Sequence, residues 1–249
     1  MEDLNKIFAE RRSIRRYQYD AIPAESMEMI FTAIRNTPSS YNGQQFSVID
    51  IDSQDIKLQL YDIIQQKQIK TCNRFLVFCV DFNKINILAK AKGITEDATE
   101  FANTVDGAIV GMVDAAMAMQ SAVLAAQAVG VGACCIGYAR TANPKKIAEI
   151  LGLPKGVFVV CGLSLGMPRE MPDLKPKQSA DLLIHKNGYR KDDMTADLVA
   201  YDQLITEYNA TRAGGTSDND WCAHMLDYYR IACGYDMKKY LSEQGLELK

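Results

Sequence analysis

No charged residue occurs between positions 115 and 139, and this uncharged run restricts the possible folds more than any other feature of the chain. It is long enough to cross a lipid bilayer. However, it consists mostly of alanine, glycine, methionine and valine, Gln120 and Gln127 lie inside it, and Gly130 and Gly132 divide it. We therefore predict a buried helix followed by a buried strand rather than a membrane span.

The composition is that of an ordinary soluble globular protein, since 48% of the 249 residues are hydrophobic, 24% are charged and the net charge is −3. Lys and Arg (28) nearly balance Asp and Glu (31), whereas a nucleic-acid-binding surface needs a basic excess, so no nucleic-acid partner is expected. Residues 1–8 lack the pattern of a secretory signal, and we expect a cytoplasmic protein. The seven cysteines are odd in number and mostly lie in apolar stretches, which indicates free thiols.

Hydrophobic spacing distinguishes the predicted helices from the predicted strands. Apolar side chains three and four apart, such as Met27, Ile30 and Ile34, predict helices, whereas apolar runs such as residues 75–80 predict strands covered on both faces. Helices are expected over residues 2–10, 24–37, 55–68, 106–129, 145–151, 196–212 and 218–239, and strands over 46–51, 75–80, 134–139 and 157–165. The three prolines of residues 167–178 predict an extended surface crossing. This order of elements indicates an α+β domain.

Two short motifs match enzyme patterns but lack the surroundings that those patterns need. Residues 162–166 read G-L-S-L-G, and Ser164, Asp181 and His185 follow the chain order of a serine hydrolase triad. A nucleophile elbow joins a strand to a helix, whereas prolines follow this segment. The glycines of residues 130–137 lie after a predicted helix and before a predicted strand, which is the reverse of a dinucleotide fingerprint.

Metal ligands are poorly represented in the chain. His185 and His224 are its two histidines, they lie far apart, and no C-x-x-C pair occurs. Cys134 and Cys135 would point to opposite faces of a strand. No metal site is therefore expected.

Three polar segments remain, and each suits an anion or a heteroaromatic ring. Residues 11–15 hold three arginines and a serine, which together fit a phosphate and a nearby carbonyl or enolate oxygen. Residues 39–44 offer hydroxyls and amides that could bond a polyol chain. Residues 175–177 hold two lysines on either side of a proline. Taken one at a time, these segments also fit a solvated helix end, a polar turn and a surface loop.

The order of the segments resembles the nitroreductase-like flavoproteins, specifically the oxygen-insensitive NADPH nitroreductase and flavin reductase branch. The resemblance covers nearly the full chain and is carried by residues 11–15, 38–44, 77–82, 135–137 with Arg140, 162–168 and 173–177. It implies one domain over residues 1–249, with a mainly antiparallel central sheet flanked by helices. It also implies a homodimer in which residues 196–249 form a helical extension that wraps the partner subunit, with one FMN at each of two sites in the dimer interface.

The resemblance implies roles for single residues as well. The FMN phosphate and the adjoining ribityl end would contact Arg11, Arg12, Ser13, Lys175 and Lys177. The ribityl chain and the pyrimidine edge would contact Ser39, Asn42, Gln44, Gln66, Lys67 and Gln68. The main chain of Cys135, Ile136, Gly137 and Tyr138 would run under the ring, with one N–H aimed at N5. Arg15 would lie beside N1 and O2, where a positive charge stabilises the reduced ring. Arg212 would meet the 2′-phosphate of NADPH. No catalytic side chain beyond the flavin is implied.

The chain departs from the pattern of this branch at four places. Arg11 stands where histidine is usual, Lys177 replaces an arginine, and Tyr138 stands where a glycine is common. Residues 216–220 lack the basic side chains expected shortly after Arg212, so the choice between NADPH and NADH stays open.

The predicted activity is FMN-dependent transfer of hydride from NAD(P)H, through flavin N5, to nitroaromatic, quinone or free flavin acceptors. The nicotinamide leaves before the acceptor takes its place over the ring. Two alternatives stay open, which are a serine hydrolase that uses Ser164 and a flavin-binding carrier or sensor without turnover. The sequence does not name the physiological acceptor.

Overall fold

The computed structural model describes residues 2–249, with side chains from Asn5 onward, and the chain divides into two units. The first unit holds the residues up to Met171 together with Asp236–Lys249, and the second is Pro172–Tyr235. The first contains α1 (Glu2–Ala9), α2 (Ala24–Arg35), η1 (Ser40–Asn42), β1 (Phe46–Ile51), α3 (Gln54–Ile64), α4 (Lys67–Thr71), β2 (Arg74–Asp81), α5 (Asn83–Ala91), α6 (Thr99–Ala102), α7 (Val105–Ala128), β3 (Gly132–Ile136), α8 (Tyr138–Thr141), α9 (Pro144–Leu151), β4 (Val157–Gly166) and α13 (Met237–Glu243). The second contains α10 (Ala180–Leu183), α11 (Thr195–Thr211) and α12 (Trp221–Ala232).

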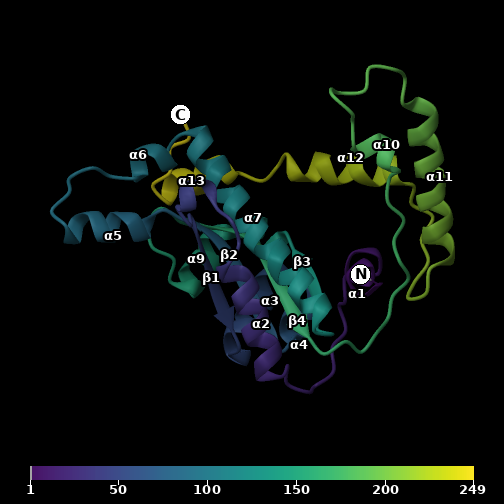
Figure 1. Ribbon diagram of the computed structural model, residues 1–249, viewed down its shortest axis with the longest axis horizontal. Coiled ribbons are helices and arrows are strands. Elements are labelled where there is room, and N and C mark those ends of the chain that lie inside the picture. The colour runs from purple at the N-terminus through teal and green to yellow at the C-terminus, as the bar shows by residue number, and fades with distance from the viewer. Residues whose placement is uncertain (1) are drawn as a thin grey trace. The chain divides into compact units, whose positions relative to one another are not determined.

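A four-stranded sheet in the order β1-β2-β4-β3 lies at the centre of the first unit, and every neighbouring pair is antiparallel (Figure 1). Successive side chains of β2 enter different clusters, because a strand alternates its faces. Leu76 and Phe78 pack in the cluster that α2 and α7 complete, whereas Phe75 and Val77 pack in the cluster that α3, α4 and α9 complete. Both faces of the sheet are therefore covered, which confirms the predicted α+β fold.

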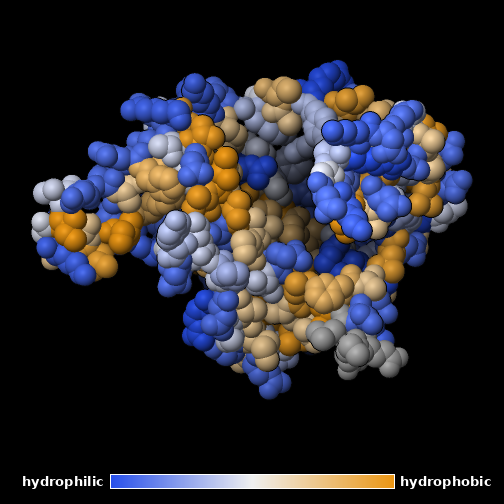
Figure 2. All heavy atoms as spheres, turned by 45° about the horizontal axis from the view of Figure 1, so that its top comes forward, coloured by the Kyte–Doolittle hydropathy of each residue, from blue (hydrophilic) through white to orange (hydrophobic). Residues whose placement is uncertain are grey.

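Helix α7 is mostly apolar, and one of its sides packs on the sheet while the opposite side is exposed. Its small residues lie against the sheet, and a Cβ atom added at Gly111 would come within 2.5 Å of Val80 Cγ1. The opposite side exposes a stripe at helical spacing, made of Val105, Ile109, Met112, Val113 and Met117. Apolar side chains gather on the surface over α5 and α7 in Figure 2. Among the described helices α7 alone has the length and apolar composition of a membrane span, and one such helix is weak evidence because the core helix of a soluble protein has them too.

The end of the chain packs on the first unit. The Gln244 amide donates to the Val157 carbonyl at 3.0 Å, and the Lys249 N–H donates to the Asn103 carbonyl at 2.8 Å. Leu246 is buried in the core cluster beside α7. Residues 236–249, which the resemblance groups with the partner-wrapping extension, thus lie against their own subunit. That residues 1–249 form one domain stays a prediction.

Most predicted elements differ from the structure only in their end residues, but three differ by more than that. The helix expected over residues 55–68 breaks at Gln65, which takes a left-handed φ of 57°. The strand expected over residues 134–139 ends at Ile136, because the chain turns at Gly137 into α8. The helix expected over residues 218–239 is two helices, since α12 ends at Ala232 and Asp236 caps α13 through the Lys239 N–H.

Candidate functional site

The segment of residues 11–17 runs beside β3. The Ile14 N–H donates to the Ala133 carbonyl at 3.0 Å, and the buried Ile14 side chain fixes the segment against the sheet. The Ser13 hydroxyl and the Gln68 amide both lie against the Cys134 sulfur, the amide nitrogen at 3.9 Å. The structure therefore brings the predicted residues of segment 11–15, α4 and β3 into one place.

Tyr17 holds this segment in place through its buried hydroxyl group. Its hydroxyl donates to the Ile14 carbonyl at 2.6 Å and meets the Ser164 hydroxyl at 2.8 Å. Burial raises the pKa of the Tyr17 phenol well above its usual value, so the hydroxyl keeps its proton.

Ser164 is fully buried within β4, and its hydroxyl also donates to the Cys134 carbonyl at 3.3 Å. A nucleophile elbow requires an exposed serine at a strand-to-helix turn, so the serine hydrolase alternative is wrong. Gly130 and Gly132 likewise follow α7 and precede or begin β3, which is the reverse of the order that a dinucleotide fingerprint needs.

Glu170 fixes the backbone next to the predicted flavin edge. Its carboxylate accepts the Arg15 N–H at 2.7 Å and the Arg16 N–H at 3.2 Å, and it lies 3.6 Å from the Arg16 guanidinium. The Arg15 guanidinium, in contrast, has no carboxylate within 4.0 Å in the described part of the chain. Its charge is therefore available to a ligand. The sequence analysis missed Glu170, because residues 167–178 predicted only an extended crossing.

Arg12 carries a buried donor without a partner. Among the described residues, its Nε atom is one of three buried side-chain polar atoms with no hydrogen-bond partner. A buried guanidinium donor left unpaired costs free energy, and an anion at this place would satisfy it. Arg11, one residue earlier, lies close enough to the Cys135 thiol to act on it electrostatically.

The end of β3 supplies the backbone expected under a ring. Cys134 is buried and Cys135 is exposed, so the two neighbours do point to opposite faces. Ile136 is buried, the side chain of Tyr138 is partly exposed, and a Cβ atom added at Gly137 would meet no atom within 4 Å. The open space above Gly137 can therefore receive a flat ligand.

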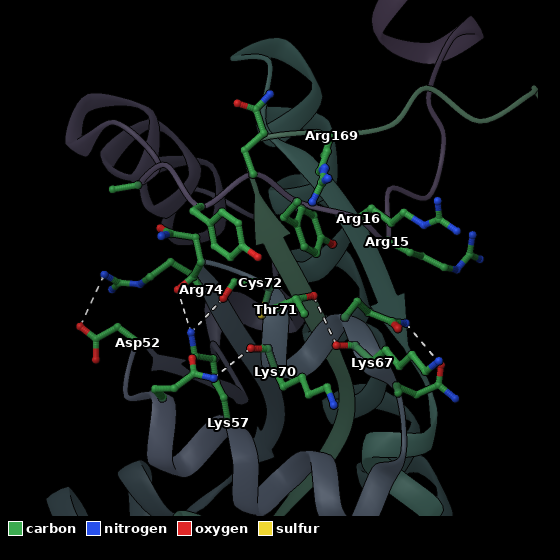
Figure 3. A pocket seen from close by; sticks show the side chains of 18 of the residues that line it. Arg15, Arg16, Asp52, Lys57, Lys67, Lys70, Thr71, Cys72, Arg74 and Arg169 are labelled. Carbon is green, nitrogen blue, oxygen red and sulfur yellow. Dashed lines mark hydrogen bonds and ion pairs between the residues drawn. The ribbon is translucent and has the colours of Figure 1, made fainter. Parts of the chain in front are cut away.

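A cavity of about 1130 Å³ opens beside Arg15 in the first unit. The predicted residues Arg15, Gln66, Lys67 and Gln68 line it, and Figure 3 shows Arg15 and Lys67 at its margin. The left-handed turn at Gln65 ends α3 and starts α4, which turns residues 66–68 toward the cavity.

The predicted residues Ser39, Asn42 and Gln44 lie elsewhere in the first unit, in a loop next to the exposed side of α7. The Ser39 hydroxyl accepts the Gln44 N–H at 3.0 Å. Tyr41, Asn42 and Gln44 all have positive φ angles near 50°, which is strained for residues other than glycine. This loop does not line the cavity beside Arg15.

Asp114 of α7 holds that loop in its strained form, and the sequence analysis missed it. Its carboxylate, on a side chain that is 1% exposed, accepts the Ser40 N–H at 3.1 Å and the Gln45 N–H at 3.2 Å. The signal in the sequence is that Asp114 is the one charged residue between Asp106 and Arg140.

We expect Asp114→Ala to lower the free energy of unfolding by about 2–4 kcal/mol, because two partly buried N–H groups lose a charged and buried acceptor. Urea denaturation followed by circular dichroism measures this loss. The matched control is Asp106→Ala, which removes an exposed carboxylate from the first turn of the same helix and should cost less than about 1 kcal/mol. Equal losses in both variants would show that Asp114 does not hold the loop.

The remaining predicted residues belong to the second unit. Lys175 and Lys177 lie in the segment before α10, and Arg212 ends α11, where its guanidinium donates to the Gly215 carbonyl at 2.8 Å. Asp173 accepts the Ala213 N–H at 2.8 Å and so ties the segment that holds the two lysines to the end of α11. Within the described residues no cluster of three His, Cys, Asp or Glu side chains could hold a metal.

The sequence matches two family models that together cover most of the chain. Residues 8–167 match the nitroreductase family, and residues 175–249 match the C-terminal domain of the nitroreductase family. The chain belongs to the nitroreductase family. The resemblance carried by the polar segments is thus confirmed.

Named relatives in the nitroreductase family include two curated enzymes. The chain is 31% identical to an FMN reductase [NAD(P)H] of Bacillus subtilis over 100% of both chains. It is 35% identical to an oxygen-insensitive NADPH nitroreductase of Salmonella typhimurium over 86% of this chain and 85% of the relative. Among solved structures, the hypothetical oxidoreductase YcnD from Bacillus subtilis has a TM-score of 0.94 at 31% identity over 100% of both chains. The nitroreductase fold therefore extends along the whole chain.

Proposed function

We propose that this protein is an FMN-dependent oxidoreductase that takes hydride from NADPH or NADH and delivers it to nitroaromatic, quinone or free flavin acceptors. Relatives that match the full or nearly full length are an FMN reductase [NAD(P)H] and an oxygen-insensitive NADPH nitroreductase. A cytoplasmic location, where reduced nicotinamide is available, belongs to the same proposal. The observation that carries it is the convergence of Arg11, Ser13, Arg15 and Gln68 on Cys134 and Cys135 of β3.

The residues of this site fit FMN. The unpartnered Nε atom of Arg12 suits the phosphate, with Arg11 and Ser13 next to it in the sequence. Lys175 and Lys177 are the further residues that the family resemblance assigns to the phosphate. The open space above Gly137 suits the ring. Arg15, whose N–H is held by Glu170, would lie beside N1 and O2 with Gln66, Lys67 and Gln68 near the pyrimidine edge. Bound FMN would supply the hydride acceptor at N5 and return the hydride to the second substrate.

The protein contributes position and charge to this exchange. Glu170 and Tyr17 fix the main chain on both sides of Arg15, so the guanidinium starts from an ordered backbone. The main-chain N–H of Tyr138, at the start of α8, is the proposed donor to N5. Arg212 is the proposed contact of the NADPH 2′-phosphate, and both nicotinamides are candidate donors of hydride.

The test is the absorption spectrum of the purified protein. We expect a yellow protein with an FMN spectrum that bleaches when NADPH or NADH is added under nitrogen and recovers with a quinone. A colourless protein that does not bind added FMN would overturn the proposal. A yellow protein that oxidises nicotinamide no faster than free FMN does would instead support the carrier or sensor.

The proposed enzyme is a homodimer, and the exposed side of α7 is the proposed contact. A stripe of five large apolar side chains is more than a free surface normally carries on one helix. Ser39 and Ser40 lie beside this stripe and share a recess of about 370 Å³ with Val113 and Met117. Burying the stripe against a second copy would bring Ser39, Asn42 and Gln44 to the partner's flavin. Residues 196–235 of the proposed extension 196–249 would wrap the partner.

We expect Val113→Glu to convert the dimer to a monomer, because it places a charge in the centre of the apolar contact. Val113 is 49% exposed in the single chain, so the subunit itself should fold normally. Size-exclusion chromatography with light scattering measures the mass. Leu58→Glu, at an exposed position of α3, is the control and should leave the dimer intact. A dimeric Val113→Glu protein would place the contact elsewhere.

A further inference from the structure

The cavity beside Arg15 carries far more positive charge than one flavin edge requires. Seven of its nineteen lining residues are arginine or lysine, and one is acidic. They come from two sides: Arg15, Arg16 and Arg169 lie on one side in Figure 3, and Lys57, Lys67 and Lys70 lie on the other. A concave surface with charge of one sign concentrates ligands of the opposite sign.

Two of the seven cations already have acidic partners. Arg74 pairs with Asp50 and lies 3.8 Å from Asp52, which is the acidic residue of the lining. Arg16 lies 3.6 Å from Glu170. Within the described residues no carboxylate comes within 4.0 Å of the other five, which are Arg15, Lys57, Lys67, Lys70 and Arg169. The cavity therefore holds several positive charges with no counter-charge of their own.

Lys57 is the most informative of these cations, because its side chain is buried. The residue is 5% exposed, and its ammonium donates to the Cys72 carbonyl at 2.9 Å and to the Asn73 carbonyl at 3.4 Å. These carbonyls satisfy two of its three hydrogens but do not neutralise its charge. A buried charge without an opposite charge is unfavourable, and an anion in the cavity that Lys57 lines would compensate it.

Lys70 of α4 and Arg169, which follows β4, both line the cavity and are not among the residues assigned to FMN. The Lys70 ammonium lies 4.0 Å from the ring centre of Tyr61, a contact that leaves its positive charge without an acidic partner. Arg169 is fixed through its N–H, which donates to the Arg16 carbonyl at 3.0 Å. A guanidinium and ammonium groups on opposite walls suit a phosphate, which accepts from several directions at once.

We propose that this cavity binds the phosphate group of the second substrate at the flavin site, which rests on the proposed function. Three of the five uncompensated cations, Lys57, Lys70 and Arg169, are not assigned to FMN, and they match a doubly or more highly charged phosphate or pyrophosphate better than a single carboxylate, which would neutralise only one. Two second substrates carry that chemistry: the nicotinamide dinucleotide, through its pyrophosphate, and free FMN as acceptor. Arg212 is followed by Asp218 and Asp220 rather than by further cations, so the basic cavity is the better match for the pyrophosphate.

The test compares Lys70→Gln/Arg169→Gln with the control Lys90→Gln/Arg35→Gln, which removes the same charge from exposed positions of α5 and α2. Calorimetry at constant ionic strength measures the affinity of each holoenzyme for inorganic pyrophosphate. We expect the cavity variant to bind pyrophosphate at least about tenfold more weakly than the wild type, with the control unchanged. Equal affinities in the variant and the wild type, or no binding to the wild type, would overturn the proposal.

Steady-state kinetics then identify the source of the phosphate. An increase of about tenfold in KM for both NADPH and NADH assigns the cavity to the donor. An increase in KM for FMN but not for riboflavin assigns it to the acceptor. Unchanged KM values for all four substrates would overturn the assignment to a second substrate. A wild-type protein without FMN would overturn the proposed function and this assignment together, while the pyrophosphate affinities still show whether the cavity binds anions.

Discussion

Replacing Arg12 by methionine is expected to weaken FMN binding about 100-fold, so that the purified variant is nearly colourless. The Arg12 Nε atom is buried and has no hydrogen-bond partner among the described residues, and Arg11 and Ser13 lie on either side in the sequence. Methionine keeps much of the apolar stem but removes the forked donors. Each charge-assisted hydrogen bond to the phosphate contributes about 1.5–3 kcal/mol, so the loss of two corresponds to at least about 100-fold in Kd.

Riboflavin provides the control that isolates the phosphate. It has the ring and the ribityl chain but no phosphate, so its affinity for Arg12→Met and for the wild-type apoprotein should be equal. Quenching of flavin fluorescence measures both affinities, and Arg35→Met at an exposed position of α2 checks for a general effect of lost charge. If Arg12→Met bound FMN as tightly as the wild type, the phosphate would lie elsewhere.

The central sheet could be predicted from the sequence because its strands are local signals. Residues 75–80 form a continuous apolar run, and β2 is covered on both faces, as such a run predicts. The bounds of β1 (Phe46–Ile51) agree with the prediction, and those of β4 (Val157–Gly166) differ by one residue. Helix α9 begins at Pro144, one residue before its predicted start, because the Asn143 side chain accepts the Lys146 N–H and proline suits the first helical position.

The errors occur where a residue adopts a conformation that its type does not suggest. Gln65 takes a left-handed φ and ends α3, although glutamine rarely does so and the apolar spacing continues past it. Helix α8 follows β3 after a single residue, and nothing in Tyr138–Thr141 distinguishes a short helix from a strand end. Both positions adjoin the candidate site, where tertiary contacts decide the backbone.

The site itself was only partly visible in the sequence. The segment of residues 11–15 was found because three arginines and a serine within five positions suit a phosphate. Glu170 and Asp114 were missed because their partners are main-chain N–H groups more than sixty positions away, and a main-chain donor has no side-chain signature. The basic cavity was missed for a similar reason. Its lining comes from segments that are far apart in the sequence and that only the folded chain brings together, which are α3, α4, residues 15–19 and residue 169.

Replacing Arg15 by methionine is expected to slow the reduction of FMN by NAD(P)H about tenfold and to lower the flavin midpoint potential by about 30 mV. The reason is that one positive charge beside N1 and O2 stabilises the reduced ring by about 1.4 kcal/mol. The Arg15 guanidinium is uncompensated by any carboxylate in the described part of the chain, and Glu170 fixes its N–H at 2.7 Å. The variant therefore loses charge without losing the backbone position. Stopped-flow absorbance measures the rate, and equilibration with a reference dye measures the potential.

Arg15→Lys tests whether charge rather than shape is responsible. Lysine keeps the charge but loses the guanidinium fork, so it should restore most of the potential while restoring the rate only in part. Because Arg15 is assigned to the ring and Arg12 to the phosphate, Arg15→Met should retain far more FMN than Arg12→Met does. Wild-type potential and reduction rate in Arg15→Met would remove Arg15 from the flavin edge, and the positive charge at N1 and O2 would then have to come from another cation of the cavity, such as Lys67.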